Sequence, residues 1–135
     1  MIEVKTVIRK SKKESWELWT KPEHVIHWNF ASDDWECSKA ESNFIVGGEF
    51  HYLMRAKDKS MEFDFWGTFT EIQEHNYIGI VLGDGRKMEV HFSQIQENET
   101  EIMEKFEPEN QNPLDLQKQG WQAILSNFAK YANQY

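Results

Sequence analysis

"FDFWGTFTEI", residues 63–72, places aromatic side chains on both faces of a segment that otherwise has the composition of a β-strand. In an extended chain Phe63 and Phe65 point to one side and Trp66 to the other, and Gly67 follows directly. A strand with one buried face needs aromatic residues on that face only. We therefore expect a bulge at Gly67 that resets the alternation and helps to bend the strand. A half-exposed surface position for Trp66 is the alternative.

Seven strands are expected in all, in this segment and on both sides of it. They cover residues 2–8, 35–41, 48–56, 61–72, 77–82, 86–96 and 100–106. The separators between the later strands, such as "KDKS", "QEHN" and "ENE", are short enough for antiparallel hairpins. Asp84-Gly85 is expected to form a two-residue type I′ turn. Two sets of alternating residues should face inward: Phe50, Tyr52 and Met54, and Met88, Val90 and Phe92.

Helix signals lie at both ends of this block of strands. Ser11 begins a capping-box pattern, and Pro22 is expected as the first residue of a second short helix. Asn112 is expected as the N-cap and Pro113 as the first residue of a helix that ends near Asn133 and is about 30 Å long. Its apolar stripe comprises Leu114, Trp121, Ile124, Leu125, Phe128 and Ala132. Because such a helix cannot lie flat on a twisted sheet, the sheet should bend around it.

Bulk composition narrows the range of partners. The formal charge of −8 repels phosphate backbones and anionic membrane surfaces, so we expect neither a nucleic acid nor a membrane as partner. The single cysteine, Cys37, cannot form an intramolecular disulfide. The first residues lack a signal-peptide pattern, and no apolar stretch approaches the roughly 20 residues of a membrane span. We expect one domain, residues 1–135, in the cytoplasm.

Three segments, "GGEFHYLMRAKD", "FDFWGTFTEI" and "GWQAILSNFAKYA", together with the order of elements, resemble the START-like (SRPBCC, Bet v 1-like) superfamily. Within it the chain is similar to the activator of heat-shock protein 90 ATPase homologue-like family. The resemblance covers nearly the entire chain. It implies an α+β helix-grip fold, in which a curved antiparallel sheet holds the long C-terminal helix and leaves an apolar cavity. The superfamily also includes polyketide cyclases, lipid carriers and plant hormone binders.

A cavity for a small hydrophobic ligand, lipid-like or polyketide-like, is the leading functional interpretation. Its expected lining residues are Phe50, Tyr52, Met54, Phe63, Phe65, Trp66, Trp121, Leu125 and Phe128. Tyr52 would present a phenol that orients a ligand carbonyl or hydroxyl, unless the backbone satisfies it. In the alternative case the nineteen aromatic side chains fill the space and leave no ligand site.

Two other functional classes remain open. One is a chaperone-associated stress-response protein that binds a chaperone through an outer surface, and the other is a cyclase or hydrolase. Asp33, Asp34 and His27 are the candidates for acid–base chemistry, and their alternative is a solvated loop position. His24 and His27 have acceptable spacing for two metal ligands, but the sequence indicates no third ligand. Cys37 has no paired histidine, so we assign no catalytic residue, metal or cofactor.

Overall fold

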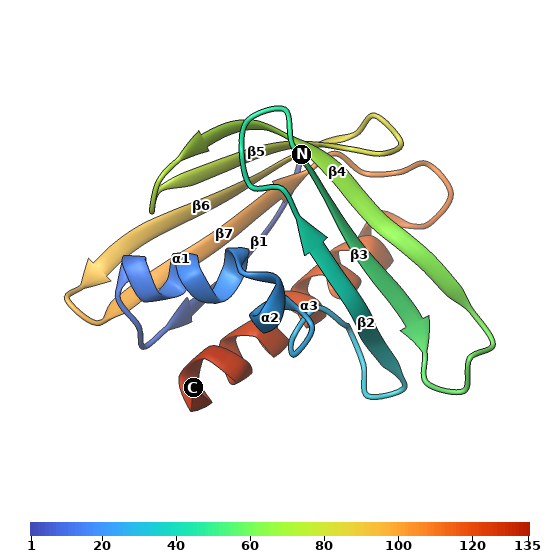
Figure 1. The fold of residues 1–135 in the computed structure, drawn as a ribbon, viewed down its shortest axis with the longest axis horizontal. Helices are drawn as coiled ribbons and strands as arrows, with labels where there is room; N and C mark the ends of the chain where they lie inside the picture. Colours follow the sequence, from blue (N-terminus) through green and yellow to red (C-terminus); the bar gives the residue numbers. More distant parts are fainter.

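The computed structural model describes residues 1–135 and contains a curved seven-stranded antiparallel sheet with a long helix on its concave side (Figure 1). The strands are β1 (Ile2–Ile8), β2 (Trp35–Ser42), β3 (Glu49–Ala56), β4 (Glu62–Gln73), β5 (Tyr77–Leu82), β6 (Lys87–Gln96) and β7 (Glu99–Phe106). The helices are α1 (Lys12–Thr20), α2 (Pro22–Val25) and α3 (Leu114–Gln134). Across the sheet the order is β1-β7-β6-β5-β4-β3-β2, so β2 to β7 form a meander and β1 joins it beside β7. The predicted helix-grip fold is confirmed.

The two short helices follow β1 and close one end of the sheet (Figure 1). Ser11 caps α1 in the predicted capping box, since its side chain accepts a hydrogen bond from the backbone N–H of Glu14 and Glu14 reaches back to the cap. Pro22 is the first residue of α2, as expected. The buried residues of α1, Ser15, Trp16 and Leu18, lie at helical spacing on the side that meets the core.

The start of α3 differs from the sequence-based prediction. Pro113, not Asn112, is the N-cap, and no side chain caps the helix. Leu114, expected in the buried stripe, is 59% exposed. Gln117 is buried instead, because its amide donates hydrogen bonds to the backbone carbonyls of Glu109 and Asn112 and holds the preceding loop against the helix. The apolar stripe therefore begins two turns later, with Trp121.

The sheet bends at positions other than the predicted one. Gly67 pairs regularly with Phe50 on β3, so the expected bulge at Gly67 is wrong. Register shifts occur instead in the β2–β3, β4–β5 and β6–β7 pairs, around Ser38, Thr70 and Ile95. Gly67 serves close packing, since a Cβ there would lie 2.9 Å from the Val81 carbonyl oxygen and 3.0 Å from the Phe50 ring.

The turn at Asp84-Gly85 also differs in type. Gly85 has a φ of +92°, whereas Asp84 does not have the positive φ that a type I′ turn requires. The N–H of Gly85 donates to the Leu82 carbonyl, and the N–H of Leu82 donates to the Arg86 carbonyl. The loop therefore has three residues, with a glycine in the left-handed region at its end.

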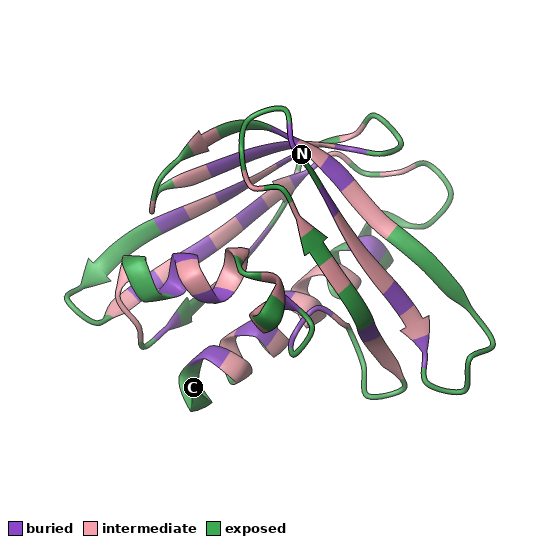
Figure 2. Cartoon of the chain, in the orientation of Figure 1, coloured by how far each residue is buried: buried purple, intermediate pink, exposed green.

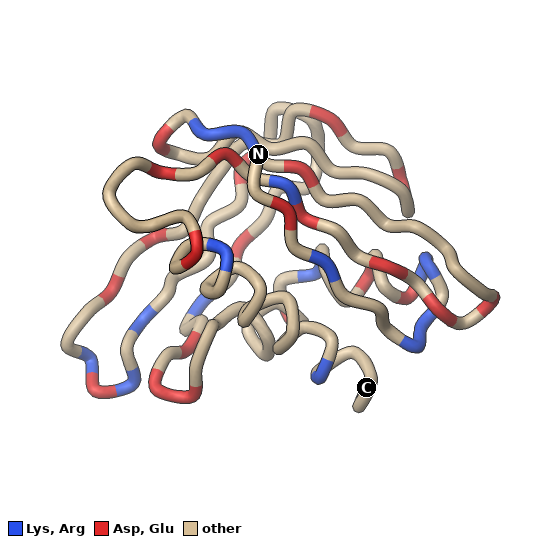
Figure 3. Tube along the Cα trace, turned by 180° about the vertical axis from the view of Figure 1, so that it is seen from behind, with Lys and Arg blue, Asp and Glu red and all other residues tan.

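The hydrophobic core lies between the concave face of the sheet and the three helices, where buried positions alternate along the strands (Figure 2). In β7 every second residue, from Thr100 to Phe106, is buried, and β1 buries Val4 and Ile8 in the same way. Charged residues are distributed over the strands, helices and loops rather than gathered in one patch (Figure 3). None of the helices is both long and apolar enough to cross a membrane.

Candidate functional site: a cavity between helix and sheet

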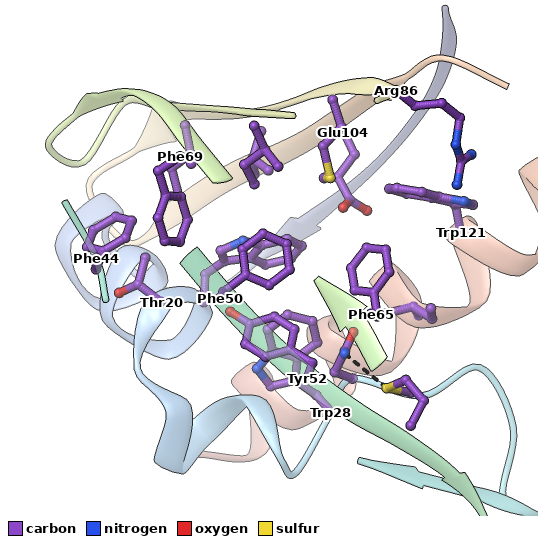
Figure 4. Close-up of a pocket in the computed structure, with 18 of the residues that line it drawn as sticks. Thr20, Trp28, Phe44, Phe50, Tyr52, Phe65, Phe69, Arg86, Glu104 and Trp121 are labelled. Atoms are coloured by element: carbon purple, nitrogen blue, oxygen red, sulfur yellow. Dashed lines mark hydrogen bonds between the residues drawn. The ribbon is translucent and has the colours of Figure 1, made fainter. Parts of the chain in front are cut away.

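A cavity of about 270 Å³ lies between α3, α1, the loop after α2 and the inner face of the sheet (Figure 4). Fifteen of its nineteen lining residues are apolar, and they come from α1, α3, strands β3 to β6 and the loops at residues 26–34 and 43–48. The four polar ones are Thr20, Asn29, Arg86 and Glu104. The aromatic side chains therefore do not fill the interior, and the alternative of a fully packed core is wrong.

Six of the nine residues predicted to line a ligand site border this cavity. They are Phe50, Tyr52, Met54, Phe63, Phe65 and Trp121. Phe63 is also 51% exposed and packs against Trp35, so it lies where the cavity approaches solvent. Leu125 and Phe128 face the same interior but are fully buried within the packed core beyond the cavity wall. Ligand binding by the six residues stays a prediction.

Trp66 lies on the outer face of the sheet, not at the cavity. Its ring stacks on His51, with centroids 5.4 Å apart and planes inclined by 10°. The indole also covers Gly83, where an added Cβ would lie 2.3 Å from its Nε1 atom. The aromatic residues of β4 thus alternate regularly, with Phe65 inward and Trp66 outward, and a histidine and a glycine cover the outward ring.

Tyr52 faces the cavity with a free hydroxyl. It lies on the inner face of β3, where its ring contacts that of Phe50 with centroids 4.7 Å apart. The hydroxyl makes no hydrogen bond within the chain. Burial raises the pKa of Tyr52 well above its usual value, so the phenol stays protonated. A backbone-satisfied tyrosine, the alternative considered for this position, is therefore not what the structure shows. The phenol is available to a ligand.

Glu104 is the second unpartnered polar group at the cavity, and the sequence-based reasoning missed it. Its side chain extends from β7 into the cavity on the side of Trp121 (Figure 4). The residue is 5% exposed, and its carboxyl group makes no hydrogen bond or ion pair within the chain. Burial raises the pKa of this carboxyl from 4.5 to about 8.

A sequence signal for Glu104 did exist. In "TEIMEKF", residues 100–106, Thr100, Ile102 and Phe106 occupy the buried face of an alternating strand, and Glu104 falls on the same face. A charged residue at an inward position of a core strand is expensive unless it is paired. A misplaced charge on an apolar face is therefore a functional candidate, as is any group with a strongly perturbed pKa in a cavity.

The other polar groups of the lining already have partners in the chain. Thr20 donates its hydroxyl to the Trp16 carbonyl at 2.8 Å, and the Asn29 amide contacts the Met54 sulfur at 3.4 Å. Arg86 donates through Nε to Asp84 at 2.7 Å and through Nη1 to the backbone carbonyl of Glu107 at 3.3 Å. Of the hydroxyl, amide and ionisable side chains in the lining, Tyr52 and Glu104 are the two that make no hydrogen bond or ion pair within the chain.

The residues considered for catalysis or metal binding lie outside the cavity. Asp33, Asp34 and His27 are exposed, so the structure does not bring them to a common site. His24 Nδ1 lies 2.7 Å from the Tyr131 hydroxyl, and the His27 ring stacks on the same tyrosine. No cluster of three or more possible metal-ligating side chains is present. Cys37 is buried in β2, and burial raises the pKa of its thiol to about 11, which disfavours a thiolate.

A curved antiparallel sheet that holds a C-terminal helix, with an apolar cavity between them, defines the helix-grip class of START-like (SRPBCC) proteins. Residues 11–133 match the family described as activator of Hsp90 ATPase homolog 1-like protein. The chain belongs to this family.

Solved structures of related proteins have the same fold. The AHSA1-like protein from Aeromonas hydrophila is 33% identical, with a TM-score of 0.89 over 98% of this chain and 93% of that one. A protein from Cytophaga hutchinsonii is 37% identical, with a TM-score of 0.85 over 98% and 92%. A third, from Nitrosomonas europaea, shares the fold at 15% identity, with a TM-score of 0.82 over 98% and 94%. No curated protein sequence gives a significant match.

Proposed function

We propose that this protein is a non-enzymatic binding module of the cytoplasm whose cavity holds a small hydrophobic or aromatic molecule, lipid-like or polyketide-like. The cavity itself is the observation that carries the proposal: about 270 Å³ lined mostly by apolar side chains, with a free Tyr52 hydroxyl. Small-molecule sites typically measure roughly 300 to 1,000 Å³ and combine apolar walls with a few polar groups. Each Å² of apolar ligand surface that is removed from water contributes about 25 cal/mol to the free energy of binding.

The placement of titratable groups supports binding rather than catalysis. The carboxylates and the histidine considered for acid–base chemistry are exposed, away from the cavity. Among the hydroxyl, amide and ionisable side chains of the cavity, Tyr52 and Glu104 are the two without partners in the chain, and they extend from different strands, β3 and β7. An apolar cavity with isolated polar groups orients a ligand without a nucleophile and its base.

A chaperone-associated role is a second candidate, supported by the family match. It predicts an exposed apolar or acidic patch near the short helices. Ile26 is the only exposed large apolar residue between residues 9 and 34, and Ile45 and Val46 are exposed on the loop whose Phe44 packs against Trp16 of α1. These three side chains are few beside the fifteen apolar residues that line the cavity, so the cavity has the stronger support. Affinity purification of the tagged protein from its native lysate tests this candidate, and recovery of the protein without any chaperone would count against it.

Native mass spectrometry of freshly purified protein, followed by a thermal-shift screen, tests the binding function. Fatty acids, flavonoids and polyketide-like aromatic compounds are suitable ligands for the screen. We expect a retained mass or a midpoint that rises with ligand concentration, because a molecule that binds only the folded state stabilises it. No retained mass and no shift with any compound would contradict the proposal.

Two matched variants test whether a compound that shifts the thermal midpoint binds in the cavity. Ile124→Phe adds a ring to the wall that α3 contributes, and the free volume lets the ring enter without displacing the core. Ser126→Phe adds the same ring on the exposed side of α3. We expect Ile124→Phe to reduce the ligand-induced shift and Ser126→Phe to retain it. Equal shifts in both variants would place the ligand elsewhere.

A further inference from the structure

The surroundings of Glu104 on the sheet contain no group that can pair with its carboxyl. Its register neighbours are Val4 on β1 and Val90 on β6, which are both buried. Two residues away along β7 lie Ile102 and Phe106, also buried. A carboxyl group held between two valines cannot be hydrated from the sheet side, so any partner must enter from the cavity.

The elements across the cavity offer no partner either. The two lining residues of α3 are Trp121 and Ile124, which carry no charge and are apolar apart from the indole N–H. Arg86 is the only cationic residue of the lining, and Asp84 and the Glu107 carbonyl already occupy its guanidinium group. Burial is the sole cause of the raised pKa of Glu104, which means that no neighbouring cation offsets it. The chain therefore leaves this acid without a counter-ion.

The remainder of the cavity wall suits an organic cation. Nine of its nineteen lining residues are aromatic, and the face of an aromatic ring attracts a cation. The net charge of −8 also raises the local concentration of cations and opposes anions such as carboxylates and phosphates. A neutral hydrocarbon would fit the walls but leave the carboxyl group unpaired.

We propose that the cavity binds small hydrophobic amines, with the ammonium group paired to the Glu104 carboxylate and the apolar part enclosed by the aromatic walls. This inference rests on the binding function proposed above and specifies the chemistry of its ligand. Tyr52, with its free hydroxyl, offers the ligand a second unpartnered polar group.

Proton release accompanies this binding mode. Near neutral pH the free carboxyl group is mostly protonated, since its pKa is about 8, and the amine is protonated in water. Pairing requires Glu104 to lose its proton to solvent, so close to one proton leaves per amine bound at pH 6. The affinity should rise up to about tenfold per pH unit from pH 6 to 8 and then level off. Tyr52 and Arg86 are the other ionisable residues of the lining, and the Tyr52 phenol stays protonated in this range because burial raises its pKa above the usual value.

Isothermal titration calorimetry with three probes of one shape tests the proposal: 2-naphthylmethylamine, 2-ethylnaphthalene and 2-acetonaphthone. Titrations at pH 6, 7 and 8, each in two buffers of different ionisation enthalpy, report affinity and proton release together. We expect the amine to bind at least about tenfold more tightly than 2-ethylnaphthalene at pH 8, as a desolvated charge pair would give. Glu104→Gln should abolish both this advantage and the proton release while retaining 2-ethylnaphthalene binding.

Glu101→Gln is the matched control, since it removes a carboxylate from the same strand. Glu101 pairs in register with Val7 and Ser93, and its side chain lies on the face of β7 opposite to Glu104. It should bind all three probes as the wild type does. Equal affinities for the amine and 2-ethylnaphthalene would overturn the amine proposal and leave the binding function intact. Tighter binding of the ketone than of the amine, with an affinity that falls above pH 8, would also overturn it. In that case the protonated Glu104 carboxyl group would donate a hydrogen bond to the ketone oxygen. Failure of every probe would count against the binding function itself.

Discussion

At the scale of single residues, Glu104 should make the fold less stable as pH rises. In the unfolded chain a glutamate ionises near pH 4.5, whereas in the folded protein its pKa is about 8. Between these values the unfolded state binds fewer protons than the folded state, so the free energy of unfolding falls as pH increases and levels off above pH 8. The loss is up to roughly 5 kcal/mol at pH 8, because each pKa unit corresponds to about 1.4 kcal/mol.

Urea denaturation of the wild type and of Glu104→Gln at pH 5, 6, 7 and 8 measures this effect. The stability of Glu104→Gln relative to the wild type should increase by several kcal/mol from pH 5 to pH 8, because glutamine does not ionise. Glu101→Gln should follow the wild type. If the wild type and Glu104→Gln gave parallel pH profiles, Glu104 would have an ordinary pKa and would be hydrated in the folded protein.

At the scale of elements, two glycines should respond in opposite ways to alanine. Gly67→Ala in β4 places a Cβ 2.9 Å from the Val81 carbonyl oxygen and should destabilise the protein by about 1–3 kcal/mol through overpacking. Gly120→Ala in α3 meets nothing within 4 Å and should stabilise it by about 0.5–1 kcal/mol through helix propensity. Chemical denaturation compares the two, and a neutral Gly67→Ala would mean that β4 and β5 separate easily.

The elements were also the part of the structure that the sequence predicted best. Alternation located all seven strands, because one face of each strand is buried and its period is read directly from the residues. Local backbone details were less predictable. The bulge lies near Thr70 rather than Gly67, and the Asp84-Gly85 turn has three residues, because inter-strand register and loop length depend on packing that is remote in sequence. Leu114 is exposed because Gln117 fastens the preceding loop.

At the scale of the whole molecule, the cavity was predictable in part. Alternation placed Phe50, Tyr52 and Met54 on its wall, and the helix period placed Trp121 there. Leu125 and Phe128 share the stripe with Trp121 but lie deeper, since the depth of a position along a helix depends on which strands it crosses. Residues such as Trp19 and Trp28 reach the wall from α1 and the loop after α2, and no sequence period connects them to the sheet.

The arrangement of α3 across the sheet predicts unequal dynamics. The helix packs closely on β1 and α1, whereas the cavity lies between it and the inner faces of β3 to β5, which it approaches through the ring contact of Trp121 with Phe65 on β4. Strand β2 forms the edge of that side of the sheet. Amides of β2 and β3 should therefore exchange with deuterium faster than those of β6 and β7 in the free protein, because fewer tertiary contacts hold them.

Hydrogen–deuterium exchange followed by mass spectrometry, with and without a compound that raises the thermal midpoint, measures this difference. A ligand in the cavity contacts α3 and β3 together, so it should slow exchange in the sheet from β2 to β4 more than in β6 and β7. Ile124→Phe without ligand should produce part of the same protection, because its ring occupies the same volume. Ser126→Phe is the control. Uniform protection over the entire chain would instead indicate a ligand that stabilises the protein from its outer surface.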